Sequence, residues 1–134
     1  MIDTRYRTAE EKGQTMAEFA LVLPIFVTLL FAIIQFGIVF NNYVTLTDAA
    51  RAGARKGAVS RNDSDPATTC QNYVKASAGD LTPGSISVTC TPSGGGWSPG
   101  NDVTVDAQYP YSINIFGMTL VTGNLHTVMK ERIE

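Results

Sequence analysis

The sequence lacks most of the side chains from which catalytic and metal sites are built. It has a single histidine, His126, and two cysteines among 134 residues. It contains no glycine-rich phosphate loop between a strand and a helix, and no group of His, Cys, Asp and Glu with the spacing of metal ligands. His126 falls in a predicted strand, and we expect its side chain to lie on the surface rather than to act as a catalytic base or a metal ligand. The sequence therefore predicts no enzyme, no cofactor and no metal site.

The chain also lacks an excess of positive charge. Its formal net charge is −2, from 10 basic and 12 acidic residues, so nothing indicates a nucleic-acid partner. The length suits one domain, but the composition is uneven: most apolar residues lie in the first third, and the rest is rich in Ser, Thr and Gly. A remainder of that size builds only a small core.

Charge is missing altogether from Phe19 to Thr47, and Glu18 is the only charged residue between Lys12 and Asp48. Residues 19–40 would span about 33 Å as a helix, close to the ~30 Å hydrocarbon core of a bilayer. The run predicts a transmembrane helix. A buried core helix and a cleaved secretory signal are the alternatives, but the first rarely runs so long without a polar face, and the second has a shorter apolar region.

Positive charges flank the apolar run on both sides, so the positive-inside rule does not orient it. An extracytoplasmic C-terminal region is expected from its two cysteines and its Ser/Thr-rich composition. An even cysteine count in a small exported region favours a disulfide between Cys70 and Cys90 over two free buried thiols.

A short polar leader ends at Gly13, and Gln14-Thr15-Met16-Ala17 separate it from Glu18 and Phe19. A glycine followed five residues later by glutamate and then an aromatic residue resembles a prepilin cleavage site. With the following Ala20–Pro24 and the small-residue and arginine stretch Asp48–Arg55, the chain resembles the TadE-like family. These are pseudopilin-like proteins of the tight-adherence (Tad, or Flp) pilus system, within the type IV pilus superfamily. The C-terminal run Gly123–Glu131 is also similar to the last strand of these proteins.

The resemblance implies cleavage between Gly13 and Gln14 by a prepilin peptidase. It implies further partners: other pilin or pseudopilin subunits, and an assembly platform in the inner membrane. It also implies a role for Glu18 beside the freed amine of an adjacent subunit, because a carboxylate in lipid gains a partner when an ammonium lies next to it. The simpler alternative is that Glu18 only reaches back to the lipid headgroups.

Pro24 interrupts the apolar run early. Proline removes a backbone donor and clashes with the carbonyl of Ala20, so the sequence predicts a kink. The kink is either incidental or a flexible joint used when the subunit leaves the bilayer; both interpretations stay open.

Beyond the bilayer the helix is expected to continue to about residue 60. Ala49, Gly53 and Gly57 form one row of small residues at a spacing of four, and a second row lies beside it. Such rows let another backbone approach closely, either the chain's own sheet or a neighbouring subunit. Arg51 and Arg55 share another face, and lipid headgroups, a partner carboxylate and water all remain possible contacts.

Four further elements are expected in the last part of the chain. Asp65 reads as the N-cap of a short helix over 66–78 that ends at Gly79. Alternating residues predict strands over 85–91 and 102–109 and a last strand over about 122–132, with 113–120 as an apolar connection.

The predicted fold is α+β: a long N-terminal transmembrane helix, a short second helix and a small three-stranded antiparallel sheet. The expected parts are a leader (1–13), an N-terminal helix (14–60) with its transmembrane segment (19–40), and an extracytoplasmic α+β region (61–134). The leading hypothesis is a minor pilin or pseudopilin in the inner membrane. A permanently anchored extracytoplasmic module is the main alternative, and a secreted enzyme is disfavoured because no catalytic set is present.

Overall fold

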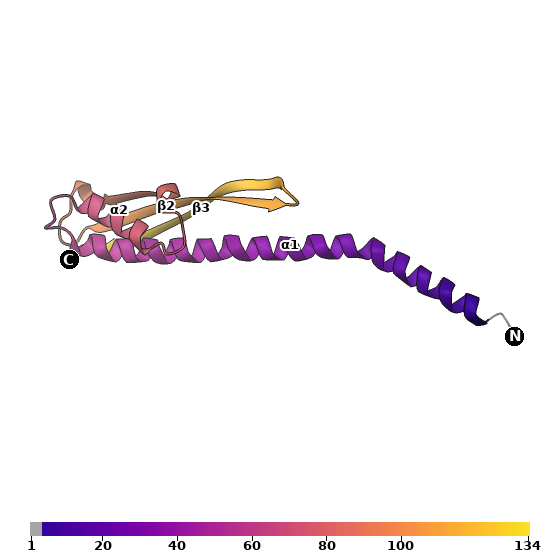
Figure 1. Cartoon of the computed structure of the whole chain (residues 1–134). Coiled ribbons are helices and arrows are strands. Elements are labelled where there is room, and N and C mark those ends of the chain that lie inside the picture. The colour runs from indigo at the N-terminus through magenta and orange to yellow at the C-terminus, as the bar shows by residue number, and fades with distance from the viewer. Residues whose placement is uncertain (1–3) are drawn as a thin grey trace.

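The computed structural model of this chain describes residues 4–134, with side chains from residue 13 onward. One long helix, α1 (Thr4–Val59), extends far beyond a small α+β region that packs on its C-terminal part (Figure 1). The predicted α+β class is confirmed, and α1 begins at Thr4 rather than at the predicted Gln14. Residues 4–13 of the predicted leader are therefore helical, and residues 1–3 lie outside the described residues.

The second helix, α2 (Pro66–Ser77), forms where the sequence predicts it. The Asp65 side chain accepts a hydrogen bond from the Thr68 backbone N–H, which otherwise has no partner in the first turn, and Pro66 occupies the first helical position. The chain leaves the helix through Gly79, whose φ of +54° is the left-handed conformation that glycine adopts without strain.

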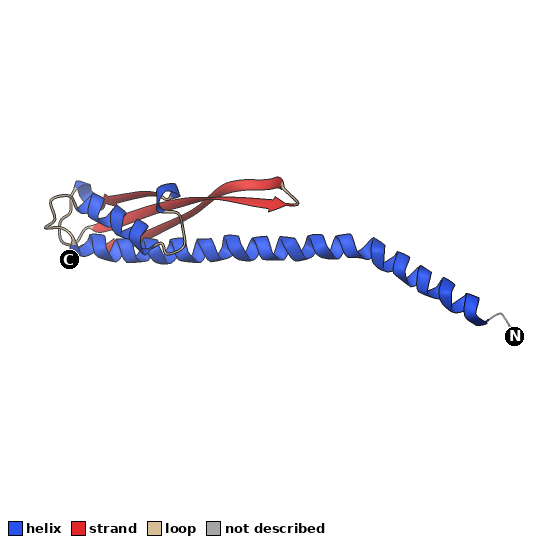
Figure 2. Cartoon of the chain, viewed as in Figure 1, coloured by secondary structure: helices blue, strands red, loops and turns tan. Residues whose placement is uncertain are grey.

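The sheet contains β1 (Ser87–Pro92), β2 (Asp102–Ile115) and β3 (Met118–Arg132), antiparallel in the order β1-β2-β3. Figure 2 shows the strands lying along α1, with β2 and β3 extending past the rest of the sheet. Two short 3₁₀ turns, Pro83–Ser85 and Ser93–Gly95, flank β1.

The prediction of an apolar connection over 113–120 is wrong. Ile113–Ile115 and Met118–Leu120 extend β2 and β3, and only Phe116 and Gly117 form the turn. The alternation of apolar residues on both sides of Phe116 is a strand pattern. The sequence did not indicate a hairpin here, because a two-residue turn usually carries Asn-Gly or Asp-Gly and this turn is Phe116-Gly117.

The core lies between α1, α2 and the sheet. From α1 it receives small side chains and one leucine, from α2 and β1 the two cysteines and Val74, and from β2 three alternating residues. The members contributed by α1 and β2 are Leu46, Ala49, Ala50, Ala54, Ala58, Val103, Val105 and Ala107. Small residues on α1 bring the helix close to both neighbours, so the core is thin and depends on close approach rather than on large side chains.

The predicted disulfide is present. Cys70 on α2 and Cys90 on β1 are bonded, with their Cα atoms 6.4 Å apart, and both are buried. It ties α2 to the edge strand of the sheet. Closing a loop of this length in the unfolded chain is worth about 3 kcal/mol by the chain-entropy model.

Candidate functional site on the N-terminal helix

Gly13 and Gln14 lie on an uninterrupted, exposed stretch of α1. Among the described residues, a Cβ added at Gly13 would meet no atom within 4 Å beyond the neighbouring helix backbone, so no tertiary contact requires glycine there. Glycine in a helix interior costs up to ~1 kcal/mol relative to alanine, which makes the Gly13–Gln14 peptide a locally weak point of the helix. Packing within the described residues therefore does not explain the glycine at position 13.

Glu18 lies one turn beyond Gln14 on the same face. The Gln14 Nε2 donates a hydrogen bond to Glu18 Oε1 across 3.2 Å, and both side chains are exposed. One neutral amide satisfies only part of what an ionised carboxylate accepts. If this turn lies in lipid, the carboxylate needs a further donor from outside its own helix.

The helix surface beyond Glu18 is apolar and bare. None of the most apolar stretch of α1 is buried within the chain, and between Gly13 and Val59 the helix is long and apolar enough to cross a membrane. Phe19, the residue after Glu18, is 64% exposed. A buried core helix is therefore the wrong interpretation of this segment, and the chain has the character of a single-pass membrane protein.

Pro24 coincides with a change of direction in α1. The helix bends in its N-terminal third (Figure 1), the part that contains Pro24, where the missing N–H breaks the hydrogen-bond ladder. The Thr28 hydroxyl donates to the Pro24 carbonyl across 2.8 Å, a bond within the helix that often accompanies such bends. The predicted kink is thus observed, and its use as a joint stays a prediction.

The row of small residues packs within the chain. Ala49 and Gly53 are buried, and a Cβ at Gly53 would overlap Cγ2 of Val74 on α2. A Cβ at Gly57 would lie 3.3 Å from the Cys70 side chain. The sequence left two packing partners open for these small residues, the chain's own sheet and a neighbouring subunit. In the structure they pack against the chain's own α2 and sheet.

Arg51 and Arg55 do not take part in that packing. Both are exposed, and Arg51 pairs with Asp48 at 3.1 Å with both side chains about two-thirds exposed. Solvent-exposed pairs of this kind contribute ~0–1 kcal/mol. The two arginines lie on the exposed face of α1, where they can make a contact outside the chain. Nothing in the described residues indicates whether lipid headgroups, a partner carboxylate or water is that contact.

The rest of the described chain offers no reactive cluster. His126 Nε2 lies 2.9 Å from Asp106 Oδ2 on the exposed sheet face, and the hydrogen bond from His126 is the main cause that lowers the pKa of Asp106. No three potential metal ligands come together among the described residues. Sequence reasoning missed this pair because its members lie on different strands and meet only in the observed register.

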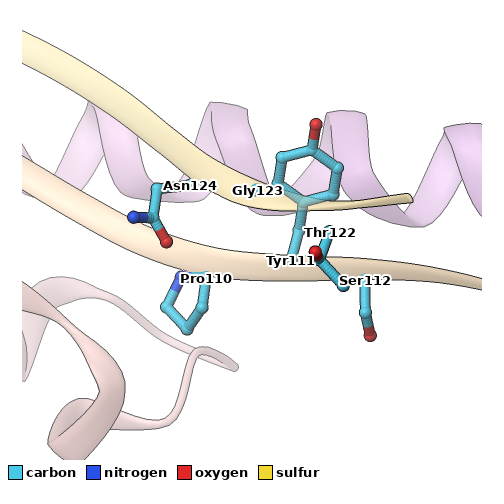
Figure 3. Close-up of a pocket in the computed structure, with 6 residues that line it drawn as sticks. All are labelled: Pro110, Tyr111, Ser112, Thr122, Gly123 and Asn124. Atoms are coloured by element: carbon cyan, nitrogen blue, oxygen red, sulfur yellow. The ribbon is translucent and has the colours of Figure 1, made fainter. Parts of the chain in front are cut away.

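A surface depression lies on the β2–β3 hairpin, and none of the residues that line it is charged (Figure 3). The residues that line it are Pro110, Tyr111, Ser112, Thr122, Gly123 and Asn124. The Tyr111 ring covers Gly123, its partner across the strands, and this packing supports the hairpin.

One stretch of the chain matches a protein-family model, and it includes Gly13, Glu18 and the apolar part of α1. Residues 13–55 match the family model of TadE-like protein. This segment resembles TadE-like proteins. It covers roughly a third of the chain and includes Glu18, Pro24 and the row of small residues. No curated protein and no solved structure matches the chain. The match is to this segment, so a pilus context for the whole chain is a proposal.

Proposed function

We propose that this chain is a minor pilin or pseudopilin of a Tad-type pilus machine. It is inserted into the inner membrane with residues 61–134 outside the cytoplasm, cut between Gly13 and Gln14 by a prepilin peptidase, and packed with other pilins through α1. An assembly platform in the inner membrane receives it. The observation that carries the proposal is the bare apolar stretch of α1 between Lys12 and Asp48, where Glu18 is the only charge, inside the segment that matches the TadE-like family model.

The geometry around Glu18 supports a role in assembly. Cutting after Gly13 creates an ammonium on Gln14, one turn from Glu18 on the same helix face. A neighbouring subunit placed alongside brings the same ammonium toward this carboxylate. The pairing removes an uncompensated charge from a low-dielectric site, an interaction worth several kcal/mol.

Cleavage is tested with Gly13→Leu. Because no described residue outside the local helix backbone lies within 4 Å of a Cβ at Gly13, the variant should keep the described fold, and a loss of processing then reports on the peptidase. Gly37→Leu is the matched control, since Gly37 lies on the same helix and is equally open. N-terminal sequencing of protein from membranes should give Gln14 for the parent and the control, and the intact leader for Gly13→Leu. Normal processing of Gly13→Leu would remove the prepilin interpretation.

Assembly is tested with Glu18→Ala. The variant should insert and be cut as well as the parent, because the segment becomes more apolar, but co-purification with other pilus subunits should fall. Gln14→Ala is the control: it removes the amide that contacts Glu18 and leaves the freed amine in place. If Glu18→Ala is cut, assembles and supports pili like the parent, the chain is better described as a permanently anchored module.

A further inference from the structure

The far end of the β2–β3 hairpin is uncharged and apolar. No charged residue lies between Asp106 and His126. β1 pairs with β2 only from Val103 to Gln108, so beyond Gln108 the sheet continues as a two-stranded ribbon. We call residues 113–121 the hairpin tip. Its apolar side chains are Ile113, Ile115, Phe116, Met118, Leu120 and Val121.

The turn of the hairpin tip carries an unusual residue. Phe116 has a φ of +51°, and it is the only non-glycine residue with positive φ among the described residues. A bulky side chain in this conformation is strained, where Asn or Gly would not be. Its side chain is also 65% exposed, as is that of Met118. Phe116 stays this exposed despite its ring contact with Phe31 on α1. The fold therefore covers little of a strained aromatic residue, and its presence points to something further that covers the tip.

The hairpin tip lies beside the apolar part of α1. The rings of Phe116 and Phe31 meet edge to face with centroids 5.5 Å apart, and Gln35 Nε2 donates to the Asn114 carbonyl across 3.1 Å. Figure 1 shows the hairpin running along α1 away from the other elements. From Phe31 to Phe40 the helix rises about 14 Å. If residues 19–40 filled the hydrocarbon, the hairpin tip would lie deep in one leaflet.

A two-stranded ribbon with largely unpaired edges is unfavourable in hydrocarbon, even though the Asn114 carbonyl accepts a bond from Gln35. Each unpaired N–H or C=O there costs several kcal/mol, and open sheet edges are not found exposed to lipid tails. In the interfacial layer, water and headgroups satisfy these groups while apolar side chains still reach the acyl boundary. Three residues of strand from the turn span about 10 Å, similar to the depth at which interfacial segments bury their apolar face.

We propose that the hairpin tip docks into the lipid interface of the leaflet from which α1 emerges, and that it sets the depth of the helix. Phe31 then lies at the hydrocarbon boundary. The membrane-spanning part runs from about Gly13 to Phe31, which is about 27 Å of helix. This differs from the 19–40 segment expected from the apolar run. The apolar character of the helix alone takes no account of the unpaired backbone groups of the β2–β3 ribbon beside it, which are unfavourable in hydrocarbon.

The placement has a consequence at the other membrane surface. Glu18 lies five residues beyond Gly13, so it would sit about 8 Å inside the opposite boundary. A carboxylate at that depth requires a partner more strongly than one at the rim. The inference rests on the membrane span in the proposed function, but not on cleavage or entry into a pilus.

The test places single tryptophans in the full chain in a Trp97→Phe background and reconstitutes it into phospholipid vesicles. The variants are Phe31→Trp and Phe116→Trp, with Phe40→Trp and Val128→Trp as matched controls. Val128 is exposed on the same strand as Met118 but far from the turn. Quenching is measured with lipids brominated either near the headgroup end or near the end of the acyl chain.

Tryptophans at 31 and 116 should be quenched several-fold more by bromine near the headgroup end than by bromine near the chain end, and those at 40 and 128 hardly at all. Quenching at 31 without quenching at 116 would overturn the docking of the hairpin tip and leave the membrane span intact. No quenching at 31 would remove the span and the proposed function with it. Strong quenching at 40, with 116 quenched best from the chain end, would overturn the proposed depth.

Discussion

Replacing Gly53 by alanine is expected to destabilise the packed region, although alanine is the better helix former. In an open helix the change stabilises by about 0.5–1 kcal/mol. At Gly53 the new methyl would overlap Cγ2 of Val74, whose side chain is fully buried. Overpacking of this kind costs about 1–3 kcal/mol. The difference is a net loss of about 1 kcal/mol, or roughly 4–8 °C in Tm for a region of this size.

The assay is urea unfolding of the full chain in detergent micelles, followed by the fluorescence of Trp97, which packs against the core. Gly37→Ala is the control without a contact, and Gly57→Ala is intermediate because its methyl would lie 3.3 Å from the Cys70 side chain. The expected order of stability is Gly37→Ala, then Gly57→Ala, then Gly53→Ala. A Gly53→Ala protein as stable as the Gly37→Ala control would refute the close approach of α1 and α2.

Three further predictions concern the disulfide, the N-cap of α2 and the β2–β3 hairpin. Replacing both Cys70 and Cys90 by serine should cost about 3 kcal/mol in the same urea assay, and the parent should resist thiol alkylation until reduced. Asp65→Ala should lower the Tm at neutral pH. Hydrogen bonds from the Thr68 hydroxyl and backbone N–H lower the pKa of Asp65, so its contribution is complete above the ordinary carboxyl pKa and is lost as pH falls through the lowered value; a difference from the parent that persists in strong acid would contradict this. Tyr111→Ala should uncover Gly123 and speed amide hydrogen exchange in the ribbon beyond Gln108 while the paired 103–108 segment stays protected.

The prediction of the fold was most successful where the signal is local. The Asp65–Pro66 cap, the glycine that ends α2 and the alternation in β2 each depend on residues within one or two turns of chain. The disulfide could be predicted because only two cysteines exist. The apolar helix and the spacing of Gly13 and Glu18 are likewise one-dimensional patterns, and the family match covers the same residues.

The prediction failed where an outcome depends on contacts between distant segments. The strand pattern over 113–120 could not be weighed against a loop until the partner strand and its register were known, and the irregular pairing at Ile113 and Asn114 makes that pattern weaker still. The small residues on α1 could serve either a neighbouring subunit or the chain itself. Only the position of α2 decides that Gly53 and Gly57 face the chain's own core.

The sequence by itself therefore determined the long apolar helix with its isolated Glu18, the disulfide and the number of strands. Composition, spacing and short-range periodicity suffice for each of these. Tertiary structure alone decided where the hairpin ends along α1. The contacts of Phe116 with Phe31 and of Asn114 with Gln35 join residues about eighty positions apart. No local pattern encodes such a distance, since it follows from strand length, register and the packing of the sheet on the helix.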